Sequence, residues 1–264
     1  MTGTAQGAIG VAVGDYDGDL LPDIYVSNFV DDYSTLYRGR PGGTFLDTTS
    51  RAKLNRPTWA MSGWGCDFCD FDNDGTLELY VVDGHVYPQV DGLDLGTTYK
   101  QRNLLFELVD GRYLEPAGGG GPGFSLEEAS RGSAVGDVDG DGDLDLLIGN
   151  IDDTPTLLRN ESPSGNWVEV LVVGPPKNTD AVGARLVAHI GDRAQLRLVA
   201  TGGSFLSSNA PEAHFGLGEA DRIDELVLTW PDGSEETFRD LEAGHLYRIR
   251  ANASGPAQVS ILER

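Results

Sequence analysis

The chain repeats one order of apolar and acidic positions three times. Each repeat begins with an alternating segment, GVAVG, GCDFC or GSAVG, and continues through an acidic loop into a second apolar segment, DIYVS, ELYVV or DLLIG. Alternation with a period of two, together with β-branched and aromatic residues, predicts strands. Each acidic loop is therefore expected at the tip of a β-hairpin.

A second hairpin is predicted in the first two repeats. LYRGRPGGTFLDT and LLFELVDGRYLEP each contain an apolar run, a glycine turn and a further strand. Four strands per repeat are typical of a propeller blade, so residues 1–163 are interpreted as three blades. Because propellers need at least four blades to close, we expect an incomplete propeller with open sheet edges.

The remaining residues, 164–264, alternate short β segments with turns and predict a small β-sandwich or barrel. VEVLVV, ARLVAHI, AQLRLVA and ELVLTW are among the predicted strands, and WPDGS at residues 230–234 has the composition of a hairpin turn. HFGLG at residues 214–218 is interpreted as a tight turn. The fold class predicted for the whole chain is therefore all-β.

Composition and charge narrow the range of partners. The chain has 264 residues, of which 36 are glycine, and a net charge of −23. A surface with this negative charge repels phosphate backbones and anionic membranes. Nucleic acid is therefore not expected as a partner, and cations are favoured as ligands. No apolar run approaches the roughly 18 residues that cross a bilayer, and membrane insertion is not expected. The first ten residues lack the basic start and apolar centre of a signal peptide.

The acidic loops carry carboxylates at positions 1, 3, 5 and 9, a spacing that lets them converge on one hard cation. Calcium takes six to eight oxygen ligands in a flexible arrangement, whereas magnesium requires a tight octahedron, so calcium fits this pattern better. The predicted ligands are Asp15, Asp17, Asp19 and Asp23 in loop 1, Asp70, Asp72, Asp74 and Glu78 in loop 2, and Asp137, Asp139, Asp141 and Asp145 in loop 3.

An EF-hand begins with a similar motif but is excluded by position 12, where it needs a bidentate glutamate between flanking helices. That position holds Val26, Val81 and Ile148, each within a predicted strand. Loop 1 departs from the other two because Leu20 occupies position 6, where they have glycine. We expect loop 1 to be distorted or weaker in binding, and calcium in loops 2 and 3.

Other residues suggest chemistry without metal. Residues 83–106 form a long excursion in the second repeat, and His85, Tyr87, Tyr99 and Arg102 are its candidate catalytic residues. The alternative is that His85 and Tyr87 pack over loop 2 and hold it. Cys66 and Cys69 have the C-x-x-C spacing of redox or zinc sites, but the chain has no second such pair, which favours small buried residues.

The acidic hairpins resemble the FG-GAP or VCBS repeat, a calcium-binding blade of integrin-α propellers and many secreted bacterial proteins. This resemblance covers roughly residues 7–160. NWVEVLVVG, AVGARLVAHIG, TGGSFLSSNAPEAHFGLG and LVLTWPDG are similar, in this order, to the ASPIC/UnbV domain that follows such repeats in the cartilage acidic protein family.

The resemblance implies an extracellular or periplasmic, calcium-dependent module for binding, adhesion or scaffolding, with a protein or carbohydrate partner. It leaves one alternative, an enzyme of a natural-product pathway that catalyses a cyclisation or rearrangement with calcium in a structural role. Family members commonly have about seven blades, and this chain has three. Either the chain is truncated, the C-terminal domain covers an edge, or copies associate through their open edges.

Overall fold

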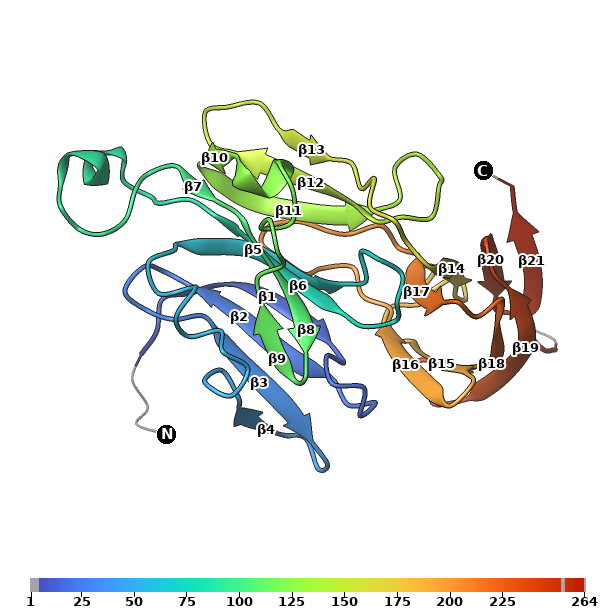
Figure 1. Ribbon diagram of the computed structural model, residues 1–264. Helices are drawn as coiled ribbons and strands as arrows, with labels where there is room; N and C mark the ends of the chain where they lie inside the picture. Colours follow the sequence, from blue (N-terminus) through green and yellow to red (C-terminus); the bar gives the residue numbers. More distant parts are fainter. Residues whose placement is uncertain (1–4, 253–254, 264) are drawn as a thin grey trace.

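The computed structural model describes residues 5–252 and 255–263, which form almost only β-strands (Figure 1). The all-β class is confirmed. None of the described helices is long and apolar enough to cross a membrane.

Three antiparallel sheets correspond to the three repeats, and we call them blades 1, 2 and 3. In each blade the acidic loop joins the first two strands, as expected. Blade 1 contains β1 (Ala8–Gly14), β2 (Asp23–Asn28), β3 (Thr35–Arg40) and β4 (Thr44–Asp47); blade 2 contains β5 (Gly63–Cys69), β6 (Glu78–Asp83), β8 (Leu104–Val109) and β9 (Arg112–Leu114); blade 3 contains β11 (Ser130–Gly136), β12 (Asp145–Asn150) and β13 (Thr156–Leu158).

Short elements link the second and third blades. They are the 3₁₀ turns η1 (Pro88–Gly92) and η2 (Gly123–Ser125) and the paired two-residue strands β7 (Gln101–Arg102) and β10 (Glu127–Glu128). The blades also share an irregularity. The register between the first two strands shifts at the same place in each, between Ala8 and Val11, Gly63 and Cys66, and Ser130 and Ser133. Such a shift raises the local twist of a strand pair.

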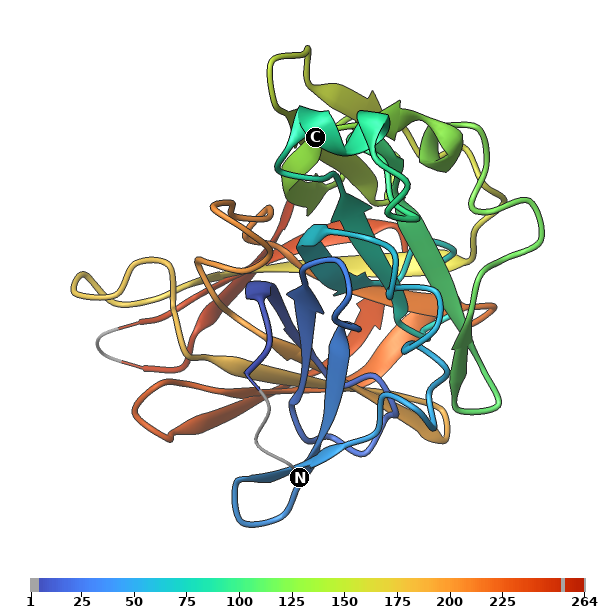
Figure 2. The same ribbon diagram turned by 90° about the vertical axis from the view of Figure 1, so that its left-hand side faces the viewer.

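The blades pack face to face through two apolar layers. Blade 1 contributes Tyr25 and Leu36 to the first layer, where they meet Phe68 and Leu79 of blade 2. The second layer joins blade 2 to blade 3 around Tyr80. Side chains alternate across a strand, so one blade supplies both layers from its two faces. Figure 2 shows the three sheets as a fan that does not close into a ring.

The C-terminal residues form a sandwich of two open four-stranded sheets, not a barrel. One sheet has the order β17, β14, β20, β21, with β14 and β20 parallel, and the other has the order β16, β15, β18, β19. The strands are β14 (Asn166–Val173), β15 (Arg185–Ile190), β16 (Arg193–Leu198), β17 (Ala213–Gly218), β18 (Arg222–Thr229), β19 (Glu235–Glu242), β20 (His245–Arg250) and β21 (Gln258–Leu262).

Residues 214–218 form most of β17, and the expected tight turn is wrong. Phe215 and Leu217 are fully buried between the two sheets, and β17 pairs with β14. Burial of these two alternate side chains favours an extended backbone over a turn. The predicted hairpin turn at residues 230–234 is confirmed, because the Trp230 amide donates to the Ser234 carbonyl over 2.8 Å and Gly233 has a φ of 86°.

The sandwich lies at the end of the blades that carries the acidic loops (Figure 1). Its connection between β16 and β17 runs back along blade 1, where the backbones of Ser204 and Val11 form a bridge. The division predicted at residue 163 stays a prediction. Residue 163 lies in the connection between β13 and β14.

Candidate metal centres

The three acidic loops, residues 15–23, 70–78 and 137–145, share one backbone conformation. Their fourth and sixth residues all have a positive φ, which side chains other than glycine adopt at a cost. Leu20 takes a φ of 63° where the other loops have glycine, so it carries strain. The distortion expected in loop 1 is therefore not found. The angles are 72°, 59° and 82° for Gly18, Asn73 and Gly140, and 90° and 91° for Gly75 and Gly142.

The first aspartate of each loop closes the turn. Its carboxylate accepts the amide of the sixth residue in all three loops: Asp15 from Leu20 over 2.9 Å, Asp70 from Gly75 over 2.9 Å, and Asp137 from Gly142 over 2.8 Å. These hydrogen bonds hold one oxygen of each first aspartate inside the loop. The loops are thus formed by their own side chains before any ion is considered.

The ninth residue fastens the base of each loop. Its carboxylate accepts the amide of the second residue: Asp23 from Tyr16 over 3.0 Å, Glu78 from Phe71 over 2.8 Å, and Asp145 from Val138 over 3.0 Å. Glu78, although one methylene longer, therefore accepts the same backbone hydrogen bond as the two aspartates. All three residues are buried.

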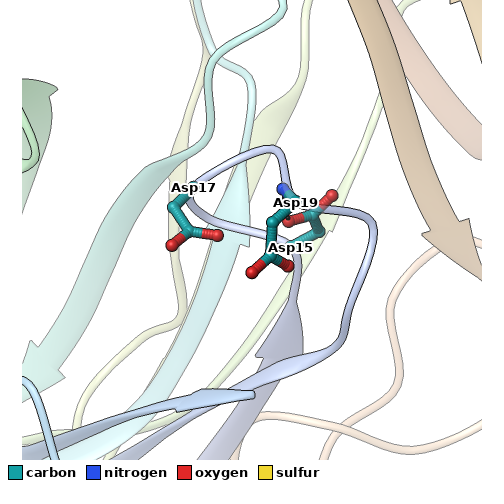
Figure 3. A group of neighbouring side chains, drawn as sticks. All are labelled: Asp15, Asp17 and Asp19. Carbon is teal, nitrogen blue, oxygen red and sulfur yellow. Dashed lines mark hydrogen bonds between the residues drawn. The ribbon is translucent and has the colours of Figure 1, made fainter. Parts of the chain in front are cut away.

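Each loop brings three carboxylates together, with one oxygen of each within 4.8 Å of the others. Figure 3 shows the group of loop 1 inside the turn. Three of the predicted ligands, Asp23, Asp74 and Asp141, lie outside these groups. The groups are Asp15, Asp17 and Asp19; Asp70, Asp72 and Glu78; and Asp137, Asp139 and Asp145. Such acidic clusters can hold a metal ion.

Loop 2 fits a cation best. Asp70 is buried, and its Oδ1 has no hydrogen-bond partner among the described residues. Burial raises the pKa of Asp70 to about 7, although Arg197 opposes the shift. Burial also raises the pKa of Glu78 to about 9, with a further contribution from Asp70. A buried, unpaired carboxylate is costly, and a bound cation removes that cost. The donor set, oxygens alone, suits calcium.

A residue beside each loop differs between the blades. Arg38, Glu107 and Arg159 occupy equivalent positions in the third strand of their blades. Each directly follows the residue that pairs across the strands with position 10, counted from the first aspartate of the loop. Arg38 forms ion pairs with Asp17 at 2.5 Å and Asp19 at 2.9 Å. Arg159 pairs with Asp139 at 2.7 Å. Loops 1 and 3 thus have an arginine of their own blade paired with their carboxylates, whereas blade 2 has Glu107 at this position. The arginines near loop 2 come from the sandwich: Arg197 acts on Asp70, and Arg193 donates to the carbonyl of Asp74.

The backbone carbonyls of the loops also form contacts with side chains of the sandwich. Arg185 donates to the carbonyl of Leu20 in loop 1 over 2.7 Å, and Arg193 donates to that of Asp74 in loop 2 over 2.6 Å. In loop 3, Nε2 of His214 lies 3.0 Å from the carbonyl of Gly142. Sequence analysis missed these three residues. Their only sequence signal is that each is a basic residue in one of three consecutive strands, β15, β16 and β17.

A cavity of about 610 Å³ lies between the blades and the sandwich. Val13 and Leu198 form part of its apolar wall, and Asp67, Arg197 and His214 form part of its polar wall. Asp67 accepts a hydrogen bond from Nδ2 of Asn209 at 2.5 Å. A volume of this size is typical of small-molecule sites.

The candidate catalytic residues do not line this cavity. His85 is buried at the end of β6 opposite loop 2, where Nδ1 accepts the amide of Tyr87 over 3.0 Å and the ring packs on Phe29. The expected packing of His85 over loop 2 is therefore wrong, because the length of β6 separates them. Tyr87 is exposed, and Arg102 pairs with Glu115 at 2.7 Å. The amide of Tyr99 donates to Asp91.

The two cysteines are free thiols in the blade cores, as predicted for small buried residues. Both are buried. Burial raises the pKa of Cys66 and Cys69, which disfavours the thiolate that redox and zinc chemistry require.

Comparison with known proteins agrees with this architecture. A family model described as FG-GAP-like repeat matches residues 15–81, which include loops 1 and 2, and a model described as ASPIC and UnbV matches residues 174–256 in the sandwich. This chain is an FG-GAP-like repeat protein with a C-terminal ASPIC and UnbV domain. The repeat supplies the acidic hairpins, and the ASPIC and UnbV domain supplies the sandwich that contacts them.

Cartilage acidic protein 1 is similar over most of the chain. The Homo sapiens protein is 30% identical over 250 residues, which are 91% of this chain and 35% of that protein. The Mus musculus protein is 30% identical over 234 residues, 85% of this chain and 34% of that protein. The chain thus spans about a third of the length of these relatives.

Among solved structures, the exotype rhamnogalacturonan lyase YesX is 15% identical and aligns over 98% of this chain and 54% of its own, with a TM-score of 0.29. A rhamnogalacturonan lyase of Bacillus licheniformis is also 15% identical, aligning over 99% of this chain and 58% of its own, with a TM-score of 0.28. A likeness this distant carries no argument about activity.

Proposed function

We propose that this chain is a calcium-binding module of an extracellular or periplasmic protein, in which it binds a protein or carbohydrate partner for adhesion or scaffolding. Two features support the proposal: the acidic clusters of the FG-GAP-like blades, and the similarity to cartilage acidic protein 1. The site residues would be the three groups of carboxylates, with the remaining acidic residues, Asp23, Asp74 and Asp141, acting as supports of the loops.

Calcium would have a structural role here. When bound, it supplies positive charge at a cluster of carboxylates that otherwise repel one another. The loop residues keep the backbone carbonyls of Leu20, Asp74 and Gly142 in the position where the sandwich contacts them. At free calcium tenfold above its dissociation constant, each occupied site stabilises the fold by about 1.4 kcal/mol.

The long excursion of blade 2 is the proposed partner contact. Residues 84–103 connect β6 to β8 outside the four-stranded sheet of blade 2, and Tyr87, Leu93 and Leu95 are exposed on them. Large apolar side chains gathered on an exposed loop are characteristic of interaction sites. The candidate catalytic residues of this excursion do not converge on a cavity, which favours binding over catalysis.

The single observation that carries the calcium assignment is the buried, unpartnered Oδ1 of Asp70 within the carboxylate group of loop 2. The experiment is calorimetric titration of the EDTA-stripped chain with calcium, for the parent, Asp70→Asn and Asp74→Asn. Asp74 lies in the same loop but outside the group, so it is the matched control. We expect Asp70→Asn to lose one equivalent of calcium and Asp74→Asn to keep it.

Thermal unfolding of the same three proteins gives a second measure. The parent and Asp74→Asn should melt at higher temperature in calcium than in EDTA, and Asp70→Asn should gain less. Equal stoichiometry for Asp70→Asn and the parent, or no heat of binding at millimolar calcium, would contradict the assignment.

A further inference from the structure

Two side-chain bridges join loops 2 and 3, and the first starts from loop 2. Asn73, the fourth residue of loop 2, is fully buried. Its Nδ2 donates to Oδ1 of Asp143 over 2.8 Å and to the carbonyl of Gly142 over 3.4 Å, both in loop 3. The amide of Gly142 in turn donates to Asp137, which belongs to the carboxylate group of loop 3. Asn73 therefore contacts the backbone that shapes the neighbouring group.

The second bridge starts from blade 3. Asn160 follows β13, and its backbone amide donates to Oδ1 of Asp145, the ninth residue of loop 3, over 2.8 Å. Its Nδ2 donates to the carbonyl of Phe71 in loop 2 over 2.6 Å. The amide of Phe71 donates to Glu78 over 2.8 Å. Asp145 and Glu78 each belong to the carboxylate group of their loop, so Asn160 links the two groups by way of Phe71.

Loops 1 and 2 have no counterpart of either bridge. The residue of loop 1 equivalent to Asn73 is Gly18, and the residues equivalent to Asn160 are Gly39 in blade 1 and Leu108 in blade 2. Glycine and leucine side chains have no hydrogen-bond donor. The amide of Gly39 still donates to the ninth residue of loop 1, over 2.6 Å, as the amide of Asn160 does in loop 3. Blade 1 therefore lacks only the bridging side chain.

We propose that calcium binding in loops 2 and 3 is cooperative, with Asn73 and Asn160 as the positioning residues that couple the two sites, and that loop 1 binds independently. This inference rests on the proposed calcium function. Repulsion among the carboxylates of an empty loop opposes the turn that the loop forms. Binding in either loop holds that turn, and the bridges restrain the other loop. A second ion then binds a restrained loop, at a smaller cost in conformational entropy.

Charge opposes this coupling. An ion in one loop reduces the negative potential that attracts an ion to the other. Salt screens that effect and leaves the bridges intact, and at physiological salt we expect the two sites to strengthen each other about five- to tenfold. Removal of one carboxylate leaves an empty loop more negative than a filled one, because the ion cancels two charges. Charge alone would therefore make such a substitution strengthen the neighbouring site.

The test is a calcium titration followed by the backbone amide signals of Gly75 and Gly142, which donate to the first aspartates of loops 2 and 3. Asp139→Asn removes a carboxylate from the loop 3 group, and we expect it to weaken loop 2 about five- to tenfold. Asp72→Asn should weaken loop 3 by the same factor, because coupling is reciprocal. Asp17→Asn disables loop 1 in the same way and is the matched control, which should weaken neither loop 2 nor loop 3.

Substitution of the bridging residues shows whether they cause the coupling. Asn73→Gly and Asn160→Gly copy the residues that blade 1 has at these positions. In the chain with both substitutions, Asp139→Asn should no longer weaken loop 2, and each single substitution should reduce its effect in part. A loss of stability alone would lower the loop 2 affinity with and without Asp139→Asn and keep their ratio. The ratio thus separates coupling from folding.

The outcomes distinguish this inference from the calcium function itself. A parent in which Gly75 and Gly142 do not respond to calcium would overturn both. Calcium binding with an unchanged loop 2 affinity in Asp139→Asn would overturn the coupling alone. Equal weakening of loop 2 by Asp17→Asn, or a coupling that survives both glycine substitutions, would overturn the role of the two asparagines.

Discussion

Acidic loops 1 and 2 have the same backbone and differ in the charge beside them. Both close through the first aspartate and fasten through the ninth residue. Arg38 lies against the carboxylates of loop 1, whereas Glu107 occupies the equivalent position in blade 2. A guanidinium already neutralises loop 1 in part. Each loop buries one carboxylate oxygen without a hydrogen-bond partner, Oδ1 of Asp17 in loop 1 and Oδ1 of Asp70 in loop 2, but of these two loops only loop 1, among the described residues, has carboxylates that form ion pairs with an arginine. The comparison shows that backbone geometry alone does not determine which loop takes calcium.

Loop 3 lies between these two cases. Arg159 contacts Asp139 of its carboxylate group, but it also pairs with Glu161 at 2.8 Å, which divides its charge. We therefore expect calcium affinity to fall from loop 2 to loop 3 to loop 1. The reason for weak calcium binding in loop 1 is then its paired arginine, Arg38, and not a distorted backbone.

The largest expected effect concerns the contacts between the loops and the sandwich. Arginines of the sandwich contact the carbonyls of loops 1 and 2, whereas a histidine, His214, contacts the carbonyl of loop 3. Burial lowers the pKa of His214 to about 4, below its ordinary value of about 6.5. As pH falls from 6.5 to 4, the unfolded chain gains a proton that the folded chain does not. The folded state should therefore lose up to about 3 kcal/mol of stability over this range.

His214→Gln should remove that loss. Urea unfolding at a series of pH values between 7 and 4 measures it, as the difference between parent and variant. His214 costs no stability above pH 6.5, so the parent curve should fall relative to the variant curve as pH drops from 6.5 to 4. Parallel curves would show that His214 is not the group responsible.

The next prediction changes the charged residues beside loops 1 and 2, Arg38 and Glu107. Glu107→Arg places a guanidinium beside loop 2 and should weaken its calcium affinity about tenfold, or about 1.4 kcal/mol, through repulsion of the ion. Arg38→Gln should strengthen loop 1 by a similar factor. Calorimetric titration measures both. Glu107→Gln is the control for loss of the native carboxylate and should weaken loop 2 less than Glu107→Arg.

The smallest effect concerns the sixth residue of the two loops. Leu20→Gly relieves the strain of a positive φ but makes the unfolded chain more flexible, and we expect a net gain of about 0.5 kcal/mol. Gly75→Leu should have the opposite and larger effect, because a Cβ there would lie 2.8 Å from Nε2 of Gln195. Chemical denaturation in EDTA separates both effects from metal binding. Stabilisation by Gly75→Leu would be inconsistent with the shared loop backbone.

Local patterns predicted the hairpins and the blades, because alternation and turn residues act within a few positions of the chain. The same locality explains the error at residues 214–218, where Gly216 and Gly218 suggested a turn but burial in the sandwich imposes a strand. The contact between Arg185 and the Leu20 carbonyl spans 165 residues, and no local pattern reports it.

One difference within the candidate site was available from the sequence. The segments LYR, LFE and LLR end at Arg38, Glu107 and Arg159 and align once the strands after each loop are placed in register. The carboxylate groups themselves followed from spacing. Which three of the four predicted carboxylates converge depends on side-chain direction, and spacing does not specify it.

The most direct test of the account is a calcium titration of the parent chain followed by the backbone amide signals of Leu20 and Gly75. Each amide donates to the first aspartate of its own loop, so each reports one site. We predict that the Gly75 signal saturates at a free calcium concentration about tenfold lower than the Leu20 signal, equivalent to about 1.4 kcal/mol. Saturation of both signals at the same concentration, or of Leu20 first, would contradict the claim that Arg38 and Glu107 set the order of binding.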